Sequence, residues 1–351
     1  MMAPLFCAVC GYLRDRMAQP LLEGWNVKIV AVTRILNEDD IVEAFVRHRA
    51  TIVDHHIFLD NGSTDDTLGI LSALKDEGLN LSVVQNQTAF FAEVNYNTAL
   101  FRSARTAFAA DWVLFLDTDE FVDTRQASGG LRPLMETLPD AVDCLGLPSF
   151  TYFDLAHDDR QEPVVPSRMR SRERVPQHSV SKLWVRGRLA DAGVTIDAGQ
   201  HYALADGQPI VSHAGHGVVL GHYYRRSAWQ EISKSVVGYL KVAAAPKLER
   251  DKDRSAHYQG VFAKLRDEPE ALFSPSFFTP TYDERDLVED PLPYLGGPLR
   301  YTQIADPKLK AVRVLLAYAE QLAQSHAGFI DTNEGVRLQA EQSTYAWTHL
   351  F

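Results

Sequence analysis

The stretch that decides the fold class reads Trp112-Val113-Leu114-Phe115-Leu116-Asp117-Thr118-Asp119-Glu120-Phe121. Its short apolar run ends abruptly in acidic residues, and such a run is typical of a strand buried on both faces. Open α/β sheets bind ligands at the carboxyl ends of their strands. Asp117 and Asp119, with Glu120 beside them, therefore suit a divalent cation held against a phosphate-bearing ligand. The alternative is a strand end whose acids are simply solvated.

The same D-x-D spacing recurs at Asp251 and Asp253, which provides an internal comparison. That second pair lies inside a charged run, and no apolar strand precedes it. A solvated surface segment is the natural interpretation there. The context, and not the spacing, makes the pair at 117 and 119 a candidate site.

The composition limits the classes of function. The chain has 351 residues, enough for one large domain or two smaller ones, and its 46% apolar and 23% charged residues are ordinary for a globular protein. The net charge of −11 argues against a nucleic-acid partner, because such binding needs a basic surface. Arginine and lysine crowd residues 168–188, which either receive an anion such as a diphosphate or form a solvated loop.

Cysteine content and hydropathy predict the compartment. Three cysteines, an odd and low number, favour a reducing environment, and Cys7-Ala-Val-Cys10 has no second pair with which to form a zinc site. The N-terminus has no basic residue before its short apolar stretch, so it is a poor signal peptide. No run reaches the length of a transmembrane segment. We expect a cytoplasmic protein, with action at the inner membrane surface through partners as an alternative.

The first 120 residues alternate between strand and helix signals. Apolar, β-branched runs predict strands, and apolar residues at helical spacing after Asn, Ser, Thr and Asp predict helices. This alternation predicts an α/β fold with a parallel sheet covered by helices on both faces. The expected strands are 27–33, 56–60, 81–84 and 112–116, and the helices between them begin near 41, 67 and 92.

Beyond residue 125 the signals are weaker. We expect a short helix at 131–138, a strand at 141–147, a long polar loop at 151–177 and several short strands between 181 and 224. A helix is expected to start near Ser227. Asp306-Pro307 is typical of a helix start, and we expect an amphipathic helix to follow it. The apolar stripe of this helix is expected to pack on the sheet or to form a dimer contact. The region 244–297 mixes charges with prolines and suggests a loosely ordered lid or extension.

Polar side chains gather at the ends of the predicted strands, and amide and carboxylate groups there suit the base, ribose and phosphates of a nucleotide. Other nucleotide and hydrolase motifs are missing, since no G-x-G-x-x-G, G-x-x-x-x-G-K-[ST] or G-x-S-x-G occurs. The residues concerned are Thr33 and Arg34, Asp60 and Asn61, Asn95 and Asn97, and Asp117 and Asp119.

Three motifs, in order, resemble those of the family 2 glycosyltransferases. They read Arg34-Ile-Leu-Asn-Glu-Asp-Asp40, Phe58-Leu-Asp-Asn-Gly-Ser-Thr-Asp-Asp-Thr67 and Asp111-Trp-Val-Leu-Phe-Leu-Asp-Thr-Asp-Glu-Phe121. The likeness is to the bacterial branch whose motifs read DNGSTDxT and DxDEF. A later stretch, His222-Tyr-Tyr-Arg-Arg-Ser227, is similar to the HYxxKS motif of that branch, with Arg226 in the place of the usual lysine.

The resemblance implies the A-type glycosyltransferase fold, which is an α/β fold with a Rossmann-like, mostly parallel sheet flanked by helices. It divides the chain into an N-terminal extension (1–26), a catalytic domain (27–245) and a mostly helical C-terminal extension (246–351). Within the catalytic domain, 27–122 is the expected nucleotide-binding half and 123–245 the acceptor half.

The resemblance also implies a nucleotide-diphosphate sugar as donor, most often linked to uridine diphosphate, and Mn²⁺ or Mg²⁺ as cofactor. A metal beside Arg or Lys stabilises the charge that the leaving diphosphate accumulates. The expected metal ligands are Asp117, Asp119 and His222; His222 is otherwise a packed strand residue. The expected donor-binding residues are Thr33, Arg34, Asp60, Asn61, Asn97, Asp117, Lys182 and Arg226. A zinc site formed by His201, His213, His216 and His222 is a weaker alternative.

We expect transfer to an acceptor hydroxyl, on a glycan or another molecule, by direct displacement with inversion. That reaction needs a general base. Asp154 is the candidate, with Asp158 next, although either could be a solvated loop acid. A nucleotidyltransferase is one alternative, but it would usually carry glycine after the first strand. The other is a nucleotide-sugar-binding protein without catalytic activity.

Overall fold

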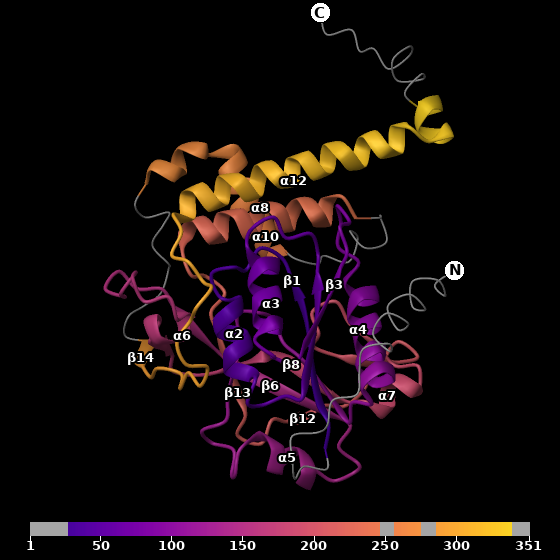
Figure 1. Ribbon diagram of the computed structural model, residues 1–351, viewed down its shortest axis with the longest axis vertical. Coiled ribbons are helices and arrows are strands. Elements are labelled where there is room, and N and C mark those ends of the chain that lie inside the picture. Colours follow the sequence, from indigo (N-terminus) through magenta and orange to yellow (C-terminus); the bar gives the residue numbers. More distant parts are fainter. Residues whose placement is uncertain (1–26, 246–255, 275–285, 339–351) are drawn as a thin grey trace, which may run out of the picture.

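The computed structural model describes residues 27–245, 256–274 and 286–338, and these residues form an α/β fold around a mixed sheet (Figure 1). One half of the sheet is parallel, in the order β3-β2-β1-β4. Its strands are β1 (Ile29–Ile35), β2 (His55–Asp60), β3 (Leu81–Gln85) and β4 (Trp112–Phe115). The strand and helix alternation expected from the sequence is confirmed in this half.

Helices cover both faces of the parallel half, which explains its continuous apolar runs. Ile29 and Ala31 of β1 pack in one core cluster with Phe45 of α2 (Val42–Arg49) and with α3 (Thr67–Asp76). Val30 and Val32 point to the other face and pack against α4 (Glu93–Phe108). Because alternate side chains of a strand point to opposite faces, both sets must be apolar.

The other half of the sheet is largely antiparallel and begins where β4 pairs with β8 (Gln177–Arg186). The long loop expected at 151–177 is wrong in part. The strand β6 (Cys144–Phe153) includes the first residues of this segment, which also holds α6 (Val165–Arg168) and β7 (Ser171–Glu173). Leu145, Leu147 and Tyr152 of this strand pack in the core, whereas Ser149, Thr151 and Phe153 line a cavity.

The remaining short elements surround this half. They are β5 (Glu120–Asp123), α5 (Leu131–Thr137), β6 (Cys144–Phe153), α7 (Arg188–Asp191), β9 (Thr195–Ile196), β10 (Ala203–Ala205), β11 (Gln208–Pro209), β12 (His213–Ala214), β13 (Val219–His222) and β14 (Leu287–Glu289). The pairing of β13 with both β5 and β6 matters most for the site, because it brings His222 beside Glu120.

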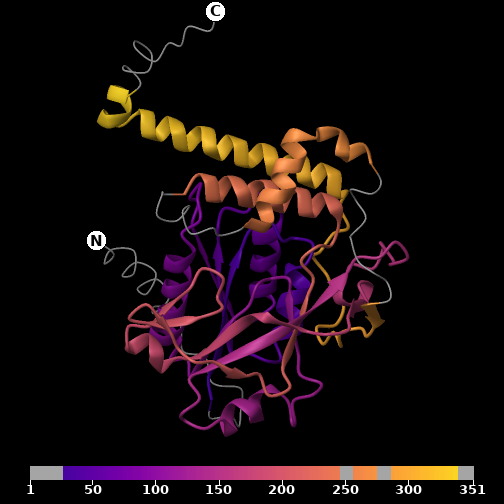
Figure 2. The ribbon, with the colours of Figure 1, turned by 180° about the vertical axis from the view of Figure 1, so that it is seen from behind.

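Helices from the C-terminal part lie across one end of the sheet, as Figures 1 and 2 show. They are α8 (Ala228–Ala243), α10 (Ala256–Asp267), the 3₁₀ helix η1 (Pro269–Phe273) and α12 (Pro307–Ile330). The expected capping residues are confirmed, because Ser227 accepts a hydrogen bond from the N–H of Gln230 and Asp306 accepts one from Lys308. The buried side of α12 packs on α8 and not on the sheet.

The expected N-terminal extension, Cys7, Cys10 and the pair Asp251 and Asp253 lie outside the described residues. Within the described ranges, no helix has the length and hydropathy needed to cross a bilayer.

Candidate active site

A large cavity of about 1030 Å³ opens at the carboxyl ends of β1 and β4. Its walls come from segments far apart in the sequence, which the sheet and α8 bring together. The strand ends supply Arg34–Glu38, Asn61 and Asp117–Glu120; β6 supplies Ser149, Thr151 and Phe153; β8 and β13 supply Lys182 and His222; and α8 supplies Glu231 and Lys234. The sequence rule that ligands bind at strand ends therefore locates the cavity correctly.

Asp119 is the most strongly held carboxylate of the cavity, and it is 3% exposed. Its Oδ2 accepts a hydrogen bond from the Lys234 ammonium at 2.7 Å, and its Oδ1 lies 3.7 Å from Nε2 of His222. Arg226 lies 3.8 Å away on the buried side. Burial alone would raise the pKa of Asp119, but the charges of Lys234 and Arg226 outweigh it and hold that pKa well below its usual range.

Asp117 is more open, since 41% of its side chain is exposed. Its Oδ2 accepts a hydrogen bond from Lys182 at 2.6 Å, and the same ammonium lies 3.4 Å from Glu120. Burial opposes ionisation here too, yet the charge of Lys182 lowers the pKa of Asp117. Two lysines therefore face two ionised carboxylates in the cavity, which is a charge pattern able to receive a cation and an anion together.

The donor set fits a divalent cation shared with a ligand. Over the three described ranges, no group of three or more His, Cys, Asp and Glu side chains could hold a metal alone, which also leaves the four-histidine zinc site without support. A metal on a nucleotide needs only one or two protein carboxylates, because phosphate oxygens and water supply the rest. Asp119 and His222 provide such a partial set beside the open carboxylate of Asp117. Burial lowers the pKa of His222, so its ring is the neutral form that binds metals.

Arg34 and Asn61 line the cavity, as expected of donor-binding residues. Arg34 donates to Glu93 at 2.7 Å. Asn61 is 4% exposed, and its Nδ2 donates to the carbonyl of Asn86 at 3.1 Å, while its Oδ1 has no partner among the described residues. A buried acceptor without a partner is rare in proteins, so a ligand N–H is the natural group to satisfy it.

Three expected donor-binding residues lie outside the cavity lining, because their side chains point into the protein. Thr33, Asp60 and Asn97 are all fully buried. The Thr33 hydroxyl donates to the carbonyl of Leu116 at 2.6 Å. Asp60 accepts from the N–H of Gly62 at 3.0 Å, which shapes the turn after β2. The Asn97 amide donates to the Asp197 carbonyl at 2.6 Å. Their roles in this structure are structural, and the expectation of direct donor contact is not supported.

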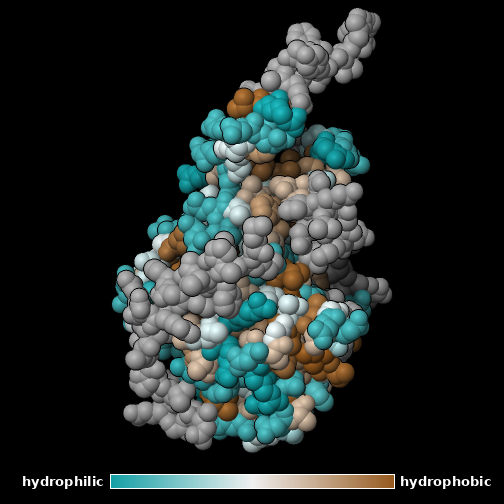
Figure 3. Space-filling model, turned by 90° about the vertical axis from the view of Figure 1, so that its right-hand side faces the viewer, coloured by the Kyte–Doolittle hydropathy of each residue, from teal (hydrophilic) through white to brown (hydrophobic). Residues whose placement is uncertain are grey.

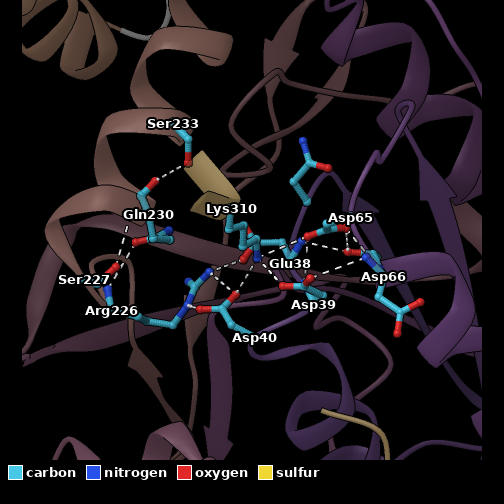
Figure 4. Close-up of polar contacts among 12 residues, drawn as sticks. Glu38, Asp39, Asp40, Asp65, Asp66, Arg226, Ser227, Gln230, Ser233 and Lys310 are labelled. Carbon is cyan, nitrogen blue, oxygen red and sulfur yellow. Dashed lines mark hydrogen bonds and ion pairs between the residues drawn. The ribbon is translucent and has the colours of Figure 1, made fainter. Parts of the chain in front are cut away.

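Arg226 is likewise outside the cavity, and it forms a buried ion-pair network (Figure 4). The guanidinium is 1% exposed and donates to Asp40 at 2.7 Å and to Glu38. Lys310 of α12 pairs with Asp39 and lies 3.1 Å from Asp65. The expected donor contact of Arg226 is therefore replaced by a structural role. The network joins α12 to the 37–40 loop, which forms one wall of the cavity.

Asp154 does not line the cavity either, and its carboxylate is paired with Arg160. Asp158 accepts from the N–H of Leu155 at 2.7 Å, which closes a local turn. Neither acid is among the residues that line the cavity, so the position of Asp154 does not support its expected role as general base. Glu231 of α8 does line it, lies 3.0 Å from Arg225, and has a pKa raised by burial.

The sequence did not predict every residue that lines the cavity. Lys234 contacts Asp119, which precedes it by 115 residues in the chain, so no local spacing could reveal the pair. Within the crowded basic segment, Lys182 lines the cavity, whereas Arg172 pairs with Asp290 and Arg188 with Asp143. Both interpretations of residues 168–188 are therefore correct in part, because Lys182 brings a positive charge to the cavity while Arg172 and Arg188 form ion pairs elsewhere.

Lys241 lies directly behind Asn61 and is fully buried. Its ammonium donates to the carbonyls of Asn61 at 3.3 Å and Thr88 at 2.8 Å, and burial lowers its pKa to about 8. An ordinary lysine, as in the unfolded chain, titrates at a pH about two units higher. Between these values the unfolded chain binds the extra proton, so stability rises with pH.

Lys241→Met should therefore remove a pH dependence. From pH 8 to pH 9.5 the free energy of unfolding of the wild type should rise by about 1.5 kcal/mol relative to the variant, because folded Lys241 is still half protonated at pH 8 and the slope reaches about 1.4 kcal/mol for each pH unit only above that value. Urea unfolding of both proteins at the two pH values measures this difference. Parallel pH profiles would mean that burial does not lower the pKa of Lys241, so that the folded and unfolded chains bind its proton equally.

Residues 32–180 match the model of the family described as "Glycosyl transferase family 2". Among solved structures, the chain is similar to S. aureus TarS 1–349, at 15% identity over 71% of this chain and 73% of that chain, with a TM-score of 0.35. It covers 44% of a longer TarS chain. It is also similar to a mannosyltransferase from Pyrobaculum calidifontis in complex with GDP-Man and Mn²⁺, at 11% identity over 96% and 91% of the two chains, with a TM-score of 0.37. No curated protein sequence matches the chain.

Proposed function

We propose that this chain, a glycosyltransferase whose residues 32–180 belong to glycosyl transferase family 2, moves a sugar from a nucleotide-diphosphate donor to an acceptor hydroxyl with the help of a divalent cation. One observation carries the proposal. Asp117 and Asp119 stand at a strand end in a large cavity, each paired with a lysine that also lines it. Carboxylates for a cation and ammonium groups for an anion are what a metal–diphosphate complex requires.

We assign the donor to the cavity on the basis of these carboxylates and lysines. Asn61, with its unpartnered acceptor, and Arg34 would contact the nucleoside, and uridine is the proposed base. Asp119 and His222, with Asp117 beside them, would hold Mn²⁺ or Mg²⁺, which neutralises charge on the leaving diphosphate. Lys234 is 33% exposed and can turn from Asp119 to the diphosphate once a cation takes its place. Lys182 is more buried and stays beside Asp117.

The acceptor is assigned to the side of the cavity formed by β6 and α8. Ser149, Thr151 and Phe153 lie on one wall there, and Glu231 lies among the α8 residues. Burial raises the pKa of Glu231, and a raised pKa brings a carboxylate closer to what a general base needs. Burial raises the pKa of Asp154 as well, so position decides: Glu231 lines the cavity and Asp154 does not, and Glu231 is the proposed base. Direct attack by the acceptor would invert the sugar carbon.

The proposed domain division changes in one respect. The halves 27–122 and 123–245 remain a proposal, and both contribute cavity residues. Tyr258 of α10 and Lys310 of α12 line the cavity as well, so the C-terminal extension is proposed to complete the site. A cytoplasmic location remains a prediction from the cysteine content.

A thermal-shift screen of UDP- and GDP-sugars, with Mn²⁺ and with EDTA, tests the function. A donor at 100 times its dissociation constant stabilises the folded state by about 2.7 kcal/mol, so its melting temperature should rise, and rise less with EDTA. ATP with Mn²⁺ is the matched control and should leave the melting temperature unchanged. The function is wrong if no nucleotide sugar shifts the transition under either condition.

The products of slow donor hydrolysis separate the alternatives. A glycosyltransferase should release a nucleoside diphosphate and the free sugar. A nucleotidyltransferase would cleave between the phosphates and release a sugar phosphate, and a binding protein would release neither. Chromatography of the reaction with UDP-glucose and Mn²⁺ distinguishes the three results.

A further inference from the structure

The outer face of α12 is apolar although it is exposed. Leu309, Val312 and Leu316 are 60%, 50% and 67% exposed. The opposite face of the helix is already packed, because Val314 and Tyr318 form a core cluster with Val237 of α8. A helix that packs only one face on its own protein normally places charged or polar residues on the other. This second apolar face therefore suits a partner.

The exposed residues follow a seven-residue repeat. The outer stripe consists of Leu309, Val312, Leu316, Ala319, Ala323, His326 and Ile330, which alternate in steps of three and four. Such spacing is the seam of a two-helix coiled coil, and the helix from Leu309 to Ile330 extends over about 32 Å. Figures 1 and 2 show that the C-terminal half of α12 projects beyond the body, where a second helix can reach it. Apolar side chains reach the surface at that end of the molecule (Figure 3), and Phe329 there is 46% exposed.

We propose that the outer stripe of α12 binds the same stripe of a second copy of this chain, in antiparallel orientation. Arg313 and Glu320 flank the stripe on the same side, one turn before and one turn after Leu316, beside which we place the two-fold axis. In an antiparallel pair related by a two-fold axis, like flanks face each other, so Arg313 of each copy meets Glu320 of the other. A parallel pair would bring neither residue to an opposite charge.

The charge of the protein favours this partner over a membrane. An amphipathic helix that lies on an anionic bilayer carries many Lys and Arg residues on its polar face. The chain has a net charge of −11, and the charged residues of α12 are few: Lys308, Arg313 and Glu320 beside the stripe, and Lys310, which is paired with Asp39. The dimer does not depend on the proposed enzyme activity, since the stripe faces away from α8 and from the cavity.

Sedimentation velocity of the full chain at 1–100 µM tests the dimer. The wild type should sediment as a dimer at the upper concentrations, and Leu316→Glu should sediment as a monomer with an unchanged melting temperature. Leu295→Glu is the matched control, because Leu295 is 55% exposed and lies outside α12, and it should leave the dimer intact. Arg313→Glu and Glu320→Arg should each weaken the dimer at least tenfold, and the double variant should restore it.

A monomeric wild type at 100 µM would overturn the proposal. So would a Leu316→Glu variant that still dimerises, or a double charge exchange that fails to restore the dimer. Flotation with phosphatidylglycerol and phosphatidylethanolamine vesicles covers the competing partner. Binding of the wild type but not of Leu316→Glu to those vesicles, without a dimer in solution, would assign the stripe to a lipid surface instead.

Discussion

Asp119→Asn should lower the kcat of sugar transfer by about 10²- to 10³-fold while the protein remains folded, because it removes the proposed metal-binding charge but keeps the shape of the side chain. Arg226 retains Glu38 and Asp40 as partners, so the buried network survives the change. The variant should also lose the Mn²⁺ dependence of donor binding, since Asp119 is the most buried carboxylate of the proposed cation site. Steady-state kinetics and calorimetric titration of the donor, with Mn²⁺ and with EDTA, measure both effects.

Asp143→Asn is the matched control for this experiment. Asp143 is also an aspartate in an ion pair, but its partner is Arg188 on the surface, and neither residue lines the cavity. Its kcat should equal that of the wild type. Full activity and unchanged metal dependence of Asp119→Asn would refute the proposed cation site, even if donor binding itself were confirmed.

The parallel half of the fold could be predicted because its strands are buried on both faces. Trp112–Phe115 and Ile29–Val32 are apolar at every position, and few structures other than a covered sheet satisfy such runs. The second half resisted prediction because polar residues interrupt the apolar pattern of β6. Ser149 and Thr151 are buried and line the cavity, so the sequence around them resembles a polar loop unless one knows that a cavity lies beside it.

The candidate site could be predicted only at the level of strand ends. That rule correctly brings Arg34, Asn61 and Asp117 to the cavity. It fails for Thr33 and Asp60, because it says where a residue lies along a strand and not toward which side its side chain points. Both side chains are needed inside, where Thr33 bonds to Leu116 and Asp60 forms the turn.

Residues from α8 were missed for a different reason. A helix that crosses the strand ends can place any of its residues over the cavity, depending on its rotation and the angle at which it enters. The rotation and the entry angle of the helix depend on tertiary contacts, such as the packing of α8 on α12, and no local sequence pattern encodes them. The same limit explains Arg226, whose charge suggested an anion site although three carboxylates already surround it.

Arg226→Met should destabilise the protein by about 3–5 kcal/mol, the largest loss of stability that we expect from a single substitution. The guanidinium is 1% exposed and lies among Glu38, Asp40 and Asp119. Methionine keeps much of the volume but removes the cation that the three carboxylates share, and Lys234 and Lys310, which remain beside them, compensate only part of the buried negative charge. Urea unfolding at pH 7.5 measures the change.

The loss of stability caused by Arg226→Met should also depend on pH. Arg226 helps to hold the pKa of Asp40 well below its usual range, against burial, which would raise it. Without Arg226 that pKa rises, so Asp40 can take up a proton as the pH falls, and protonation relieves the uncompensated charge. The difference between wild type and variant should therefore be smaller at pH 5 than at pH 7.5. Arg188→Met, which breaks an ion pair whose arginine is 47% exposed, should cost less than about 1 kcal/mol at both values. An Arg226→Met loss as small as that of this control would show that the buried network does not hold the 37–40 loop in place.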